Sequence, residues 1–386
     1  LRIGDSVSLS GKKVPEHTRR VELAKMNRKS LPFRVSYSAL KLLFIKLKHI
    51  GDALLLTPAL VAVRAEYPDA EIHVIVRAGT EGILSGCSAI DQIHTAAPPG
   101  GIRRISSFWN DFKLAMRLRR HRFDIAIHLG EGMRGNILAK ASNASVIHAN
   151  SSTGLKPNDW ISAGFTSLSK ISSKQIHQAE RDFRVVSDIL PVSTRPVPAL
   201  CFERSRTLLW RGPKPLVVFH PATRWNCKKW PIEKWIQLGR LFPAEFNILV
   251  SCGPHPVEKR DAHTIANEIG PRATTTEGKF SWAELAGALY SAKLFVGVDT
   301  AAMHLAAACQ CPTVAIFGPS RTWAWAPWKT KSRIVGPTEE QWAQAAKGDT
   351  EKFLKNIIET MSVRDVFAAC EDLLEASFSQ KLTKSK

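Results

Sequence analysis

Residues 41–60, which read KLLFIKLKHIGDALLLTPAL, decide the fold. The apolar run that begins this stretch is typical of a buried strand, and Gly51 allows the sharp turn that follows. A helix is expected to begin at Asp52 and to run to about Tyr67, because Pro68 cannot continue it. A strand, a turn and a helix in this order predict one unit of a parallel sheet that is covered by helices.

The same alternation continues along the chain and then begins again. Further strands are expected at 71–76, 91–95, 124–129, 216–219, 246–251, 294–298 and 313–317. Helices are expected at 108–122, 231–242, 257–269, 281–290 and 300–309, with two more helical patterns at about 350–359 and 362–376. This pattern predicts an α/β protein with two Rossmann-like, doubly wound domains that face each other across a cleft. Ligands of such sheets bind at the carboxyl ends of the strands.

The proline content suggests where the domains divide. Five prolines between 191 and 215 fix φ and lack a backbone donor, which predicts an irregular linker. We therefore expect an N-terminal domain at 39–190, a C-terminal domain at 216–340 and C-terminal helices at 341–386. Residues 1–38 show no apolar periodicity and carry three pairs of basic residues. They predict a basic arm that is either mobile or anchored on a membrane surface.

The composition excludes several classes of protein. Of 386 residues, 44% are hydrophobic and 23% are charged, which is ordinary for globular domains and excludes a wholly disordered chain. No run of about 18 apolar residues is present to cross a membrane. The first residues lack the apolar segment of a secretory signal, so a cytoplasmic location is expected. Seven scattered cysteines, an odd number, argue against a disulfide framework.

The net charge of +20 predicts an anionic partner. Residues 1–200 hold 29 Lys and Arg against 16 Asp and Glu, so the larger share of the surplus lies in this part of the chain. Charge alone leaves nucleic acid, a phosphorylated substrate and an anionic membrane open. No Asp-x-Asp pair occurs to hold the Mg²⁺ of a nucleotide sugar, so no metal site is expected. The charge of a departing diphosphate must then be met by cations and helix amides.

Asp52 follows the first strand at the edge of the sheet where ligands bind. Its carboxylate either caps the helix or, as a general base, removes a proton from an incoming hydroxyl. Lys48, His49 and Gly51 lie in the same turn. No GxGxxG sequence follows this strand, so the dinucleotide-binding fingerprint is absent.

A second candidate site, HPATRWNCKKWP at 220–231, follows the first strand of the C-terminal half. Arg224, Lys228 and Lys229 supply three cations, and Thr223 adds a hydroxyl at the carboxyl end of the strand. This set fits a pyrophosphate. The alternative is a solvated basic turn.

Two further candidates follow later strands. In VGVDTAAMH at 296–304, Asp299 is expected to cap a helix whose first amides, at Thr300 and Ala301, attract an anion. His304 lies one turn later, either as a site residue or as a satisfied core residue. The last candidate is FGPS, which contains Gly318 and is followed by three tryptophans that either stack on a ligand ring or pack in the core: Trp323, Trp325 and Trp328.

Taken together, KLLFIKLKHIGDALLLTPAL, HPATRWNCKKWP, and VGVDTAAMHLAAA with PTVAIFGPS resemble the ADP-heptose:lipopolysaccharide heptosyltransferases. The RW…K-x-WP and FGPS…WAWAPW patterns are most similar to the heptosyltransferase III branch. The resemblance covers roughly residues 41–330. It implies a GT-B fold, in which the N-terminal domain binds a lipid-linked acceptor and the C-terminal domain binds ADP-heptose. It also implies single displacement with inversion, without a dedicated metal site or another cofactor.

The resemblance also implies roles for the matched residues. Asp52 is the catalytic base, and Lys228 stabilises the departing phosphate. The donor-binding positions of the family match Thr223, Asp299, Thr300 and His304. From their place in the same motifs, we assign Arg224, Lys229, Ala301 and Gly318 to the donor site and Lys48, His49 and Gly51 to the acceptor site.

Three positions depart from the family pattern. Ala301 stands where many members have glycine, and Ala222 stands where some have a second threonine. Some members place a glutamate after the central strand of this domain. Here residues 253–256 read GPHP, and Glu258 is only nearby. These departures bear on the identity of the transferred sugar rather than on the reaction.

The sequence therefore predicts an inverting, metal-independent heptosyltransferase of the lipopolysaccharide inner core. It would act on the cytoplasmic face of the inner membrane, where its basic surplus meets an anionic surface. The alternatives are a related transferase with another sugar or acceptor and a non-catalytic relative that binds glycans. A nucleotide-sugar epimerase or other dinucleotide enzyme would need the absent fingerprint. A nucleic-acid-binding protein would need a recognition module, and no nucleic-acid partner is expected.

Overall fold

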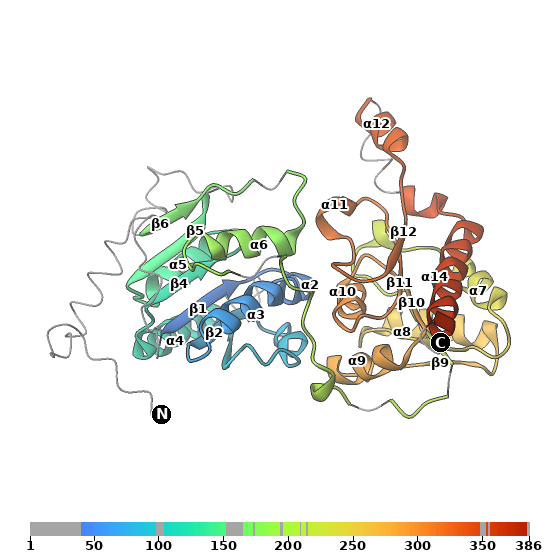
Figure 1. Ribbon diagram of the computed structural model, residues 1–386, viewed down its shortest axis with the longest axis horizontal. Helices are drawn as coiled ribbons and strands as arrows, with labels where there is room; N and C mark the ends of the chain where they lie inside the picture. The colour runs from blue at the N-terminus through green and yellow to red at the C-terminus, as the bar shows by residue number, and fades with distance from the viewer. Residues whose placement is uncertain are drawn as a thin grey trace, which may run out of the picture.

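Two six-stranded parallel sheets with flanking helices form the described part of the chain (Figure 1). The computed structural model describes residues 40–97, 104–130, 132–151, 165–172, 174–193, 196–208, 210–213, 215–347, 353 and 356–383. The basic arm predicted at 1–38 lies outside these residues.

The first sheet has the order β3-β2-β1-β4-β5-β6, and all its neighbouring strands are parallel. Its strands are β1 (Lys41–Lys46), β2 (Glu71–Arg77), β3 (Gln92–Ala96), β4 (Ile125–His128), β5 (Val146–Asn150) and β6 (Ser167–Ser169). The strand order reverses between β1 and β4, and ligands bind to open sheets at such switch points.

Helices cover both faces of the first sheet, which is why the inner residues of β1 and β2 are buried whichever face they point to. On one face, Leu114 and Leu118 pack against Ile45 and Ile75. The helices of this half are α2 (Ile50–Leu54), α3 (Thr57–Glu66), α4 (Arg104–His121), α5 (Met133–Ala141) and α6 (Gln178–Ser187), with the 3₁₀ helix η1 (Glu81–Leu84).

The second sheet repeats this topology, with the order β12-β11-β10-β7-β8-β9 and parallel pairs throughout. Its strands are β7 (Leu216–His220), β8 (Asn247–Val250), β9 (Ala273–Thr275), β10 (Leu294–Val298), β11 (Thr313–Ile316) and β12 (Ser332–Val335). The switch point lies between β7 and β10. The helices of this half are α7 (Ile232–Leu241), α8 (Pro256–Ile269), α9 (Trp282–Ser291), α10 (Ala301–Ala308) and α11 (Thr322–Trp325), with the 3₁₀ helices η3 (Arg204–Arg206) and η4 (Asn226–Lys228).

The C-terminal helices complete the second half. They are α12 (Glu339–Lys347), the 3₁₀ helix η5 (Ile357–Thr360) and α14 (Val363–Thr383). α14 buries Val366, Cys370 and Leu373 in the core of the second sheet. It corresponds to the helix expected at 362–376. In the pattern predicted at 350–359, the described residues Phe353 and Asn356 are helical and η5 follows them, whereas α12 was not predicted. The domain boundaries placed at 190 and 215 remain a prediction.

The single helix predicted from Asp52 to Tyr67 is wrong, because the structure divides it into α2 and α3. Pro58 lies in the first turn of α3 and has no backbone N–H with which to continue a helix from α2. The hydroxyl of Thr57 instead donates to the carbonyl oxygen of Leu54 at 2.7 Å. The break leaves α2 as a separate short helix at the carboxyl end of β1.

The two halves contact each other through α2 and α10, which lie side by side in Figure 1. A Cβ atom at Gly51 would lie 3.0 Å from Cδ2 of His304 and 3.6 Å from Cα of Ala301, so a side chain here would press on the His304 ring. A second contact brings Gly82 of η1 to the ring of Trp282 of α9. None of the helices in the described residues is long and apolar enough to span a bilayer.

Candidate active site

A cavity of about 560 Å³ opens between the carboxyl ends of the two sheets. The first half contributes the turn after β1 and the end of β2, and the second half contributes the loops after β7, β8 and β10 together with α9. The predicted site residues that line it are His49, Gly51, Asp52, Thr223, Arg224, Lys228, Asp299, Thr300, Ala301 and His304. Ten residues chosen from separate motifs therefore meet in one cavity.

The two carboxylate oxygens of Asp52 lie in different environments. Asp52 is the third residue of α2 rather than its N-cap, and its Oδ2 accepts a hydrogen bond from the backbone N–H of His49 at 3.1 Å. Oδ1 is buried and accepts no hydrogen bond from the described residues. A buried acceptor without a partner is costly to the free protein. Asp52 itself lines the cavity, so a hydroxyl that reached this oxygen would supply the missing hydrogen bond.

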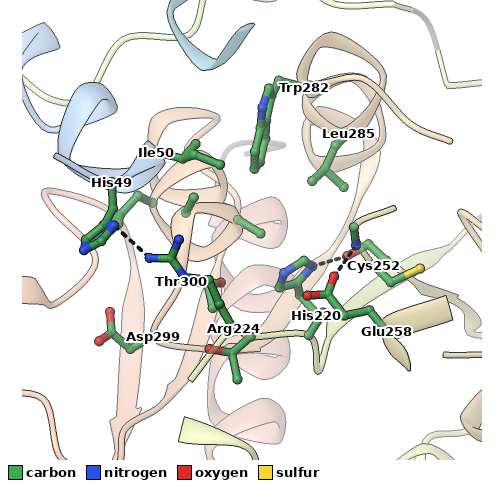
Figure 2. Close-up of a pocket in the computed structure, with 18 of the residues that line it drawn as sticks. His49, Ile50, His220, Arg224, Cys252, Glu258, Trp282, Leu285, Asp299 and Thr300 are labelled. Atoms are coloured by element: carbon green, nitrogen blue, oxygen red, sulfur yellow. Dashed lines mark hydrogen bonds between the residues drawn. The ribbon is translucent and has the colours of Figure 1, made fainter. Parts of the chain in front are cut away.

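His49 joins the two halves of the molecule. Its Nδ1 lies 2.9 Å from Nη2 of Arg224, which can donate to the neutral imidazole (Figure 2). Burial lowers the pKa of His49. The negative charge of Asp52 acts to raise this pKa, and the positive charge of Arg224 lowers it further. The guanidinium of Arg224 also lies over the ring of Trp225, 5.5 Å from its centroid.

Lys228 and Asp299 form an ion pair with 2.5 Å between Nζ and Oδ2. Lys228 ends η4, and Asp299 directly follows β10. The prediction that Asp299 caps the next helix is wrong, because Thr300 is the N-cap of α10 and its side chain makes no capping bond. Asp299 instead holds the ammonium group of Lys228 beside the cavity. Within the described part of the chain, no side chain accepts a hydrogen bond from the first amides of α10.

His304 is almost fully buried one turn into α10. Its Nδ1 has no hydrogen-bond partner among the described residues. Burial lowers the pKa of the imidazole, while the carboxylates of Asp299 and Asp52 act in the opposite direction. His304 is thus a neutral side chain with an uncommitted nitrogen between the two acids, not a satisfied core histidine.

Three predicted residues do not line the cavity: Lys48, Lys229 and Gly318. Gly318 is buried against Ile358 and the carbonyl oxygen of Cys227, so a Cβ atom there would be 3.0–3.1 Å from both. Glycine at position 318 therefore allows close packing beside the site. The tryptophans that follow it also separate: Trp325 lines the cavity, Trp323 is exposed, and Trp328 stacks on His177.

Several cavity residues were not predicted from the sequence. Glu258, in the first turn of α8, accepts a hydrogen bond from the backbone N–H of Gly253 at 2.9 Å. In the sequence, Glu258 lies two residues beyond the segment 253–256, where some family members place a glutamate. The path of the loop after β8 brings it into the cavity. Trp282 and Leu285 of α9 form an apolar wall on the other side of the cavity from Asp299 (Figure 2). The helix itself was predicted at 281–290 from the capping box at its start, but its orientation was not.

A buried ion pair between Lys46 and Asp182 stabilises the elements that carry the site. Nζ of Lys46, at the end of β1, lies 2.6 Å from Oδ2 of Asp182 and donates to the carbonyl oxygen of Leu129 at 3.0 Å. Burial raises the pKa of Asp182, and the Lys46 charge opposes this rise. Gln178 donates to the other carboxylate oxygen at 2.8 Å. These contacts fasten α6 to the carboxyl ends of β1 and β4.

Paired Rossmann-like domains with a cavity at their facing strand ends are the architecture of the GT-B fold. A profile of glycosyltransferase family 9 (heptosyltransferase) matches residues 112–355, which is more than half of the chain. The chain belongs to this family, and both the resemblance and the assignment as a glycosyltransferase are confirmed.

Named relatives and solved structures agree with this assignment. The chain is 26% identical to a lipopolysaccharide heptosyltransferase 3 of Escherichia coli over 340 residues, which cover 85% of this chain and 97% of the relative. It is 28% identical to lipopolysaccharide heptosyltransferase 1 of E. coli K12, over 73% of this chain and 88% of the relative. Among solved structures, E. coli heptosyltransferase WaaC with ADP has a TM-score of 0.71 at 22% identity, covering 86% of this chain and all of that one. E. coli ADP-heptose lps heptosyltransferase II has a TM-score of 0.71 at 17% identity, covering 88% of this chain and 99% of that one. These two likenesses confirm the GT-B fold.

Proposed function

We propose that this protein transfers heptose from ADP-heptose to a hydroxyl of the lipopolysaccharide inner core, with inversion at the anomeric carbon. The observation that carries the proposal is the uncommitted, buried oxygen of Asp52, which shares a cavity with the Lys228–Asp299 ion pair of the other half. One half thus offers a base, and the other offers charge for a departing diphosphate. The names of the relatives supply heptose and lipopolysaccharide, and the name of the solved heptosyltransferase II supplies ADP-heptose.

In the proposed reaction, the acceptor hydroxyl donates its hydrogen bond to Oδ1 of Asp52. Its oxygen attacks the anomeric carbon from the face opposite the phosphate, and Asp52 takes the proton. The bond between the anomeric carbon and the phosphate oxygen breaks, and its electron pair leaves with ADP. His49 and Gly51 line the acceptor side of the same turn.

Protein cations and amides meet the charge of the leaving group in this proposal. Lys228, Arg224 and Thr223 lie at the carboxyl end of β7, and the uncapped N-terminus of α10 faces the same cavity. Helix amides and cations stabilise anions without a metal ion. The carboxylates of Asp299 and Glu258 are already bound to Lys228 and to a backbone amide. These contacts support a metal-independent reaction.

Glu258 is proposed to contact the transferred sugar. It lines the cavity from the first turn of α8, where the sequence alone had placed no glutamate in register. A carboxylate accepts hydrogen bonds from sugar hydroxyls, and such charged bonds are stronger than neutral ones. The apolar wall of Trp282 and Leu285 is then available to the adenine ring.

We also propose that the protein docks on the anionic cytoplasmic face of the inner membrane through α4 and α5. These adjoining helices expose large apolar side chains: Trp109, Phe112, Met116, Met133 and Ile137. Exposed basic residues accompany them on α4, namely Lys113, Arg117, Arg119 and Arg120. Apolar side chains with flanking cations fit an interfacial membrane contact.

A nucleotide panel and a turnover assay test the proposed reaction. ADP should raise the melting temperature more than UDP or GDP, because ligand binding stabilises the folded state by mass action. ADP should also be released from ADP-heptose only when a lipopolysaccharide core acceptor is present. Equal stabilisation by all three nucleotides would contradict the donor. ADP binding without turnover would indicate a glycan-binding relative instead.

Vesicle sedimentation tests the membrane contact. The variant Trp109→Ser/Phe112→Ser should lose binding to anionic vesicles, and wild-type binding should fall as salt rises. The control is Leu241→Ser/Ile334→Ser, which changes two exposed apolar residues of the other half. Wild-type binding that depends neither on the anionic lipid content nor on the salt concentration would contradict the proposal.

A further inference from the structure

Three histidines from separate elements meet on one face of the first sheet, away from the cavity. His73 of β2 and His94 of β3 point to the same face, because His73 pairs with Gln92, two residues before His94. His121, the last residue of α4, covers them from above. The ring centroids of the three histidines lie 4.7–5.6 Å apart.

The geometry of the three rings is close to that of a metal site. One nitrogen from each histidine lies within 4.8 Å of the other two. Nδ1 of His73 and Nε2 of His94 already face each other at 3.0 Å. Two nitrogens bound to one tetrahedral zinc ion are about 3.3 Å apart, given bonds of about 2.0 Å. A small movement of the rings would therefore admit an ion between them.

The hydrogen bonds around His73 orient it as a ligand. Its Nε2 lies 2.8 Å from Oε1 of Glu71, so this nitrogen carries the proton and Nδ1 is left as an acceptor. Metal-binding histidines commonly donate their other N–H to a carboxylate in this way. In the structure, the lone pair of Nδ1 faces a proton on Nε2 of His94. When a metal ion binds Nε2 of His94, the single proton of this neutral imidazole moves from Nε2 to Nδ1.

The surroundings keep His73 and His94 neutral, and the Glu71 carboxylate lies beside them. Burial lowers the pKa of His73 and brings the pKa of His94 to about 4, so neither imidazole is protonated near pH 7. Lys41 forms an ion pair with Glu71 at 3.0 Å, and Arg117 is the other cation that acts on the cluster. The Glu71 carboxylate opposes both.

We propose that His73, His94 and His121 bind one zinc-like divalent cation, which fastens the end of α4 to β2 and β3. Imidazole ligands suit Zn²⁺ and its neighbours Co²⁺, Ni²⁺ and Cu²⁺. The site is separate from the transferase reaction. His73 lies four residues before Arg77, the cavity residue of β2, which is about 13 Å along the strand.

Titration of the metal-free protein with Co²⁺ and Zn²⁺, after removal of any polyhistidine tag, tests this site. The wild type should bind one ion per chain, show the visible absorption of four-coordinate Co²⁺, and melt at a higher temperature with Zn²⁺. His121→Ala should abolish the Co²⁺ spectrum and the Zn²⁺ shift. Glu71→Gln should weaken binding by about 10–100-fold, as expected for a residue that orients a ligand.

Two controls keep the test decisive. His263→Ala, which removes an exposed histidine of α8, should bind both ions like the wild type. His121 stacks on Phe123, so its alanine variant should melt below the wild type without metal but, unlike the wild type, should gain nothing from Zn²⁺. If that variant unfolds, His121→Asn takes its place. A wild type that binds no ion, or a His121 variant that binds as tightly as the wild type, would overturn the proposal.

Discussion

Asp52 shows how one residue can serve both the fold and the proposed chemistry. One carboxylate oxygen closes the start of α2 by accepting the N–H of His49, and the other is buried without a partner. The first contact fixes the position of the side chain, so the second oxygen needs little reorganisation to meet a hydroxyl. Positioned groups of this kind supply a large part of enzymatic rate enhancement.

Removal of the Lys228 side chain should weaken ADP binding. Lys228→Ala deletes the cation and leaves the nearly buried Asp299 unpaired beside the diphosphate. A charged hydrogen bond contributes about 1.5–3 kcal/mol, so the dissociation constant for ADP should rise about 10–100-fold. Calorimetric titration measures it. Lys229→Ala is the matched control, because Lys229 does not line the cavity, and equal losses in both variants would refute the assignment.

Substitution of Glu258 should affect the sugar and not the nucleotide. Glu258→Gln keeps the size of the side chain but removes its charge, so kcat/KM for ADP-heptose should fall about 10–100-fold while ADP affinity stays close to that of the wild type. Steady-state kinetics and ADP titration separate the two effects. Glu268→Gln, at the exposed end of the same helix, is the control. A variant that loses ADP affinity instead would place Glu258 on the nucleotide.

The sequence predicted those site residues that follow a strand directly, because every parallel strand ends at the same edge of its sheet. Asp52, Thr223 and Asp299 are examples. It did not predict Lys46 with Asp182, which lie 136 residues apart, since a lysine inside a strand gives no signal of its partner. It also missed Glu258, whose position depends on the path of the loop after β8.

At the scale of elements, the contact between α2 and α10 brings the two halves of the site together. Gly51 lets α2 approach the N-terminus of α10, and His304 fills the space beside it. The base and the helix amides belong to these two helices. Their spacing therefore sets the distance between the acceptor side and the donor side of the cavity.

Enlargement of Gly51 should disturb this contact. In Gly51→Ala, the new methyl group would lie 3.0 Å from the buried ring of His304. We expect a net loss of stability, because overpacking costs about 1–3 kcal/mol and exceeds the gain of about 0.5–1 kcal/mol from helix propensity. Thermal melting measures the change. The same substitution in a His304→Ala background should cost less, and an equal cost in both backgrounds would show that the ring is not the obstacle.

The central strands and long helices were predictable because their apolar patterns are strong. β10 lies at the predicted residues, and the other predicted strands differ by one or two residues at their ends. The strands β5, β6, β9 and β12 were missed, because β6 and β9 have three residues each and β5 and β12 have short apolar runs. The helices α5 and α6 were also not predicted. The split between α2 and α3 was missed because the helical pattern continues across Pro58.

At the scale of the whole molecule, contacts at both ends of the cleft join the two halves. Besides α2 with α10, Nε2 of His177 donates to the carbonyl oxygen of Ala326 at 2.9 Å, and the ring stacks on Trp328. Trp328 in turn donates to the carbonyl oxygen of Pro198 at 2.9 Å. Burial lowers the pKa of His177 to about 4. The joint between the halves therefore depends on a neutral histidine.

The stability of the protein should fall in mild acid. Burial lowers the pKa of His128, His177 and His220 to about 4, whereas in the unfolded chain these groups titrate near 6.5. Below about pH 6.5 the unfolded state binds more protons than the folded state, so stability is full above that pH and is lost as pH falls toward 4. Urea unfolding of the metal-free protein between pH 8 and pH 4 measures this. A midpoint that does not change over this range would contradict the prediction, and His128→Asn should flatten the profile.

The turnover of Asp52→Asn at saturating ADP-heptose and acceptor tests the central claim most directly. The substitution keeps the shape of the side chain but removes its capacity to take a proton. The proposed role as base predicts that kcat falls by about 10²–10⁴-fold, while the dissociation constant for ADP stays near that of the wild type. Asp69→Asn, an exposed aspartate of the same half, is the control and should retain full activity. Near-normal turnover by Asp52→Asn would contradict the account.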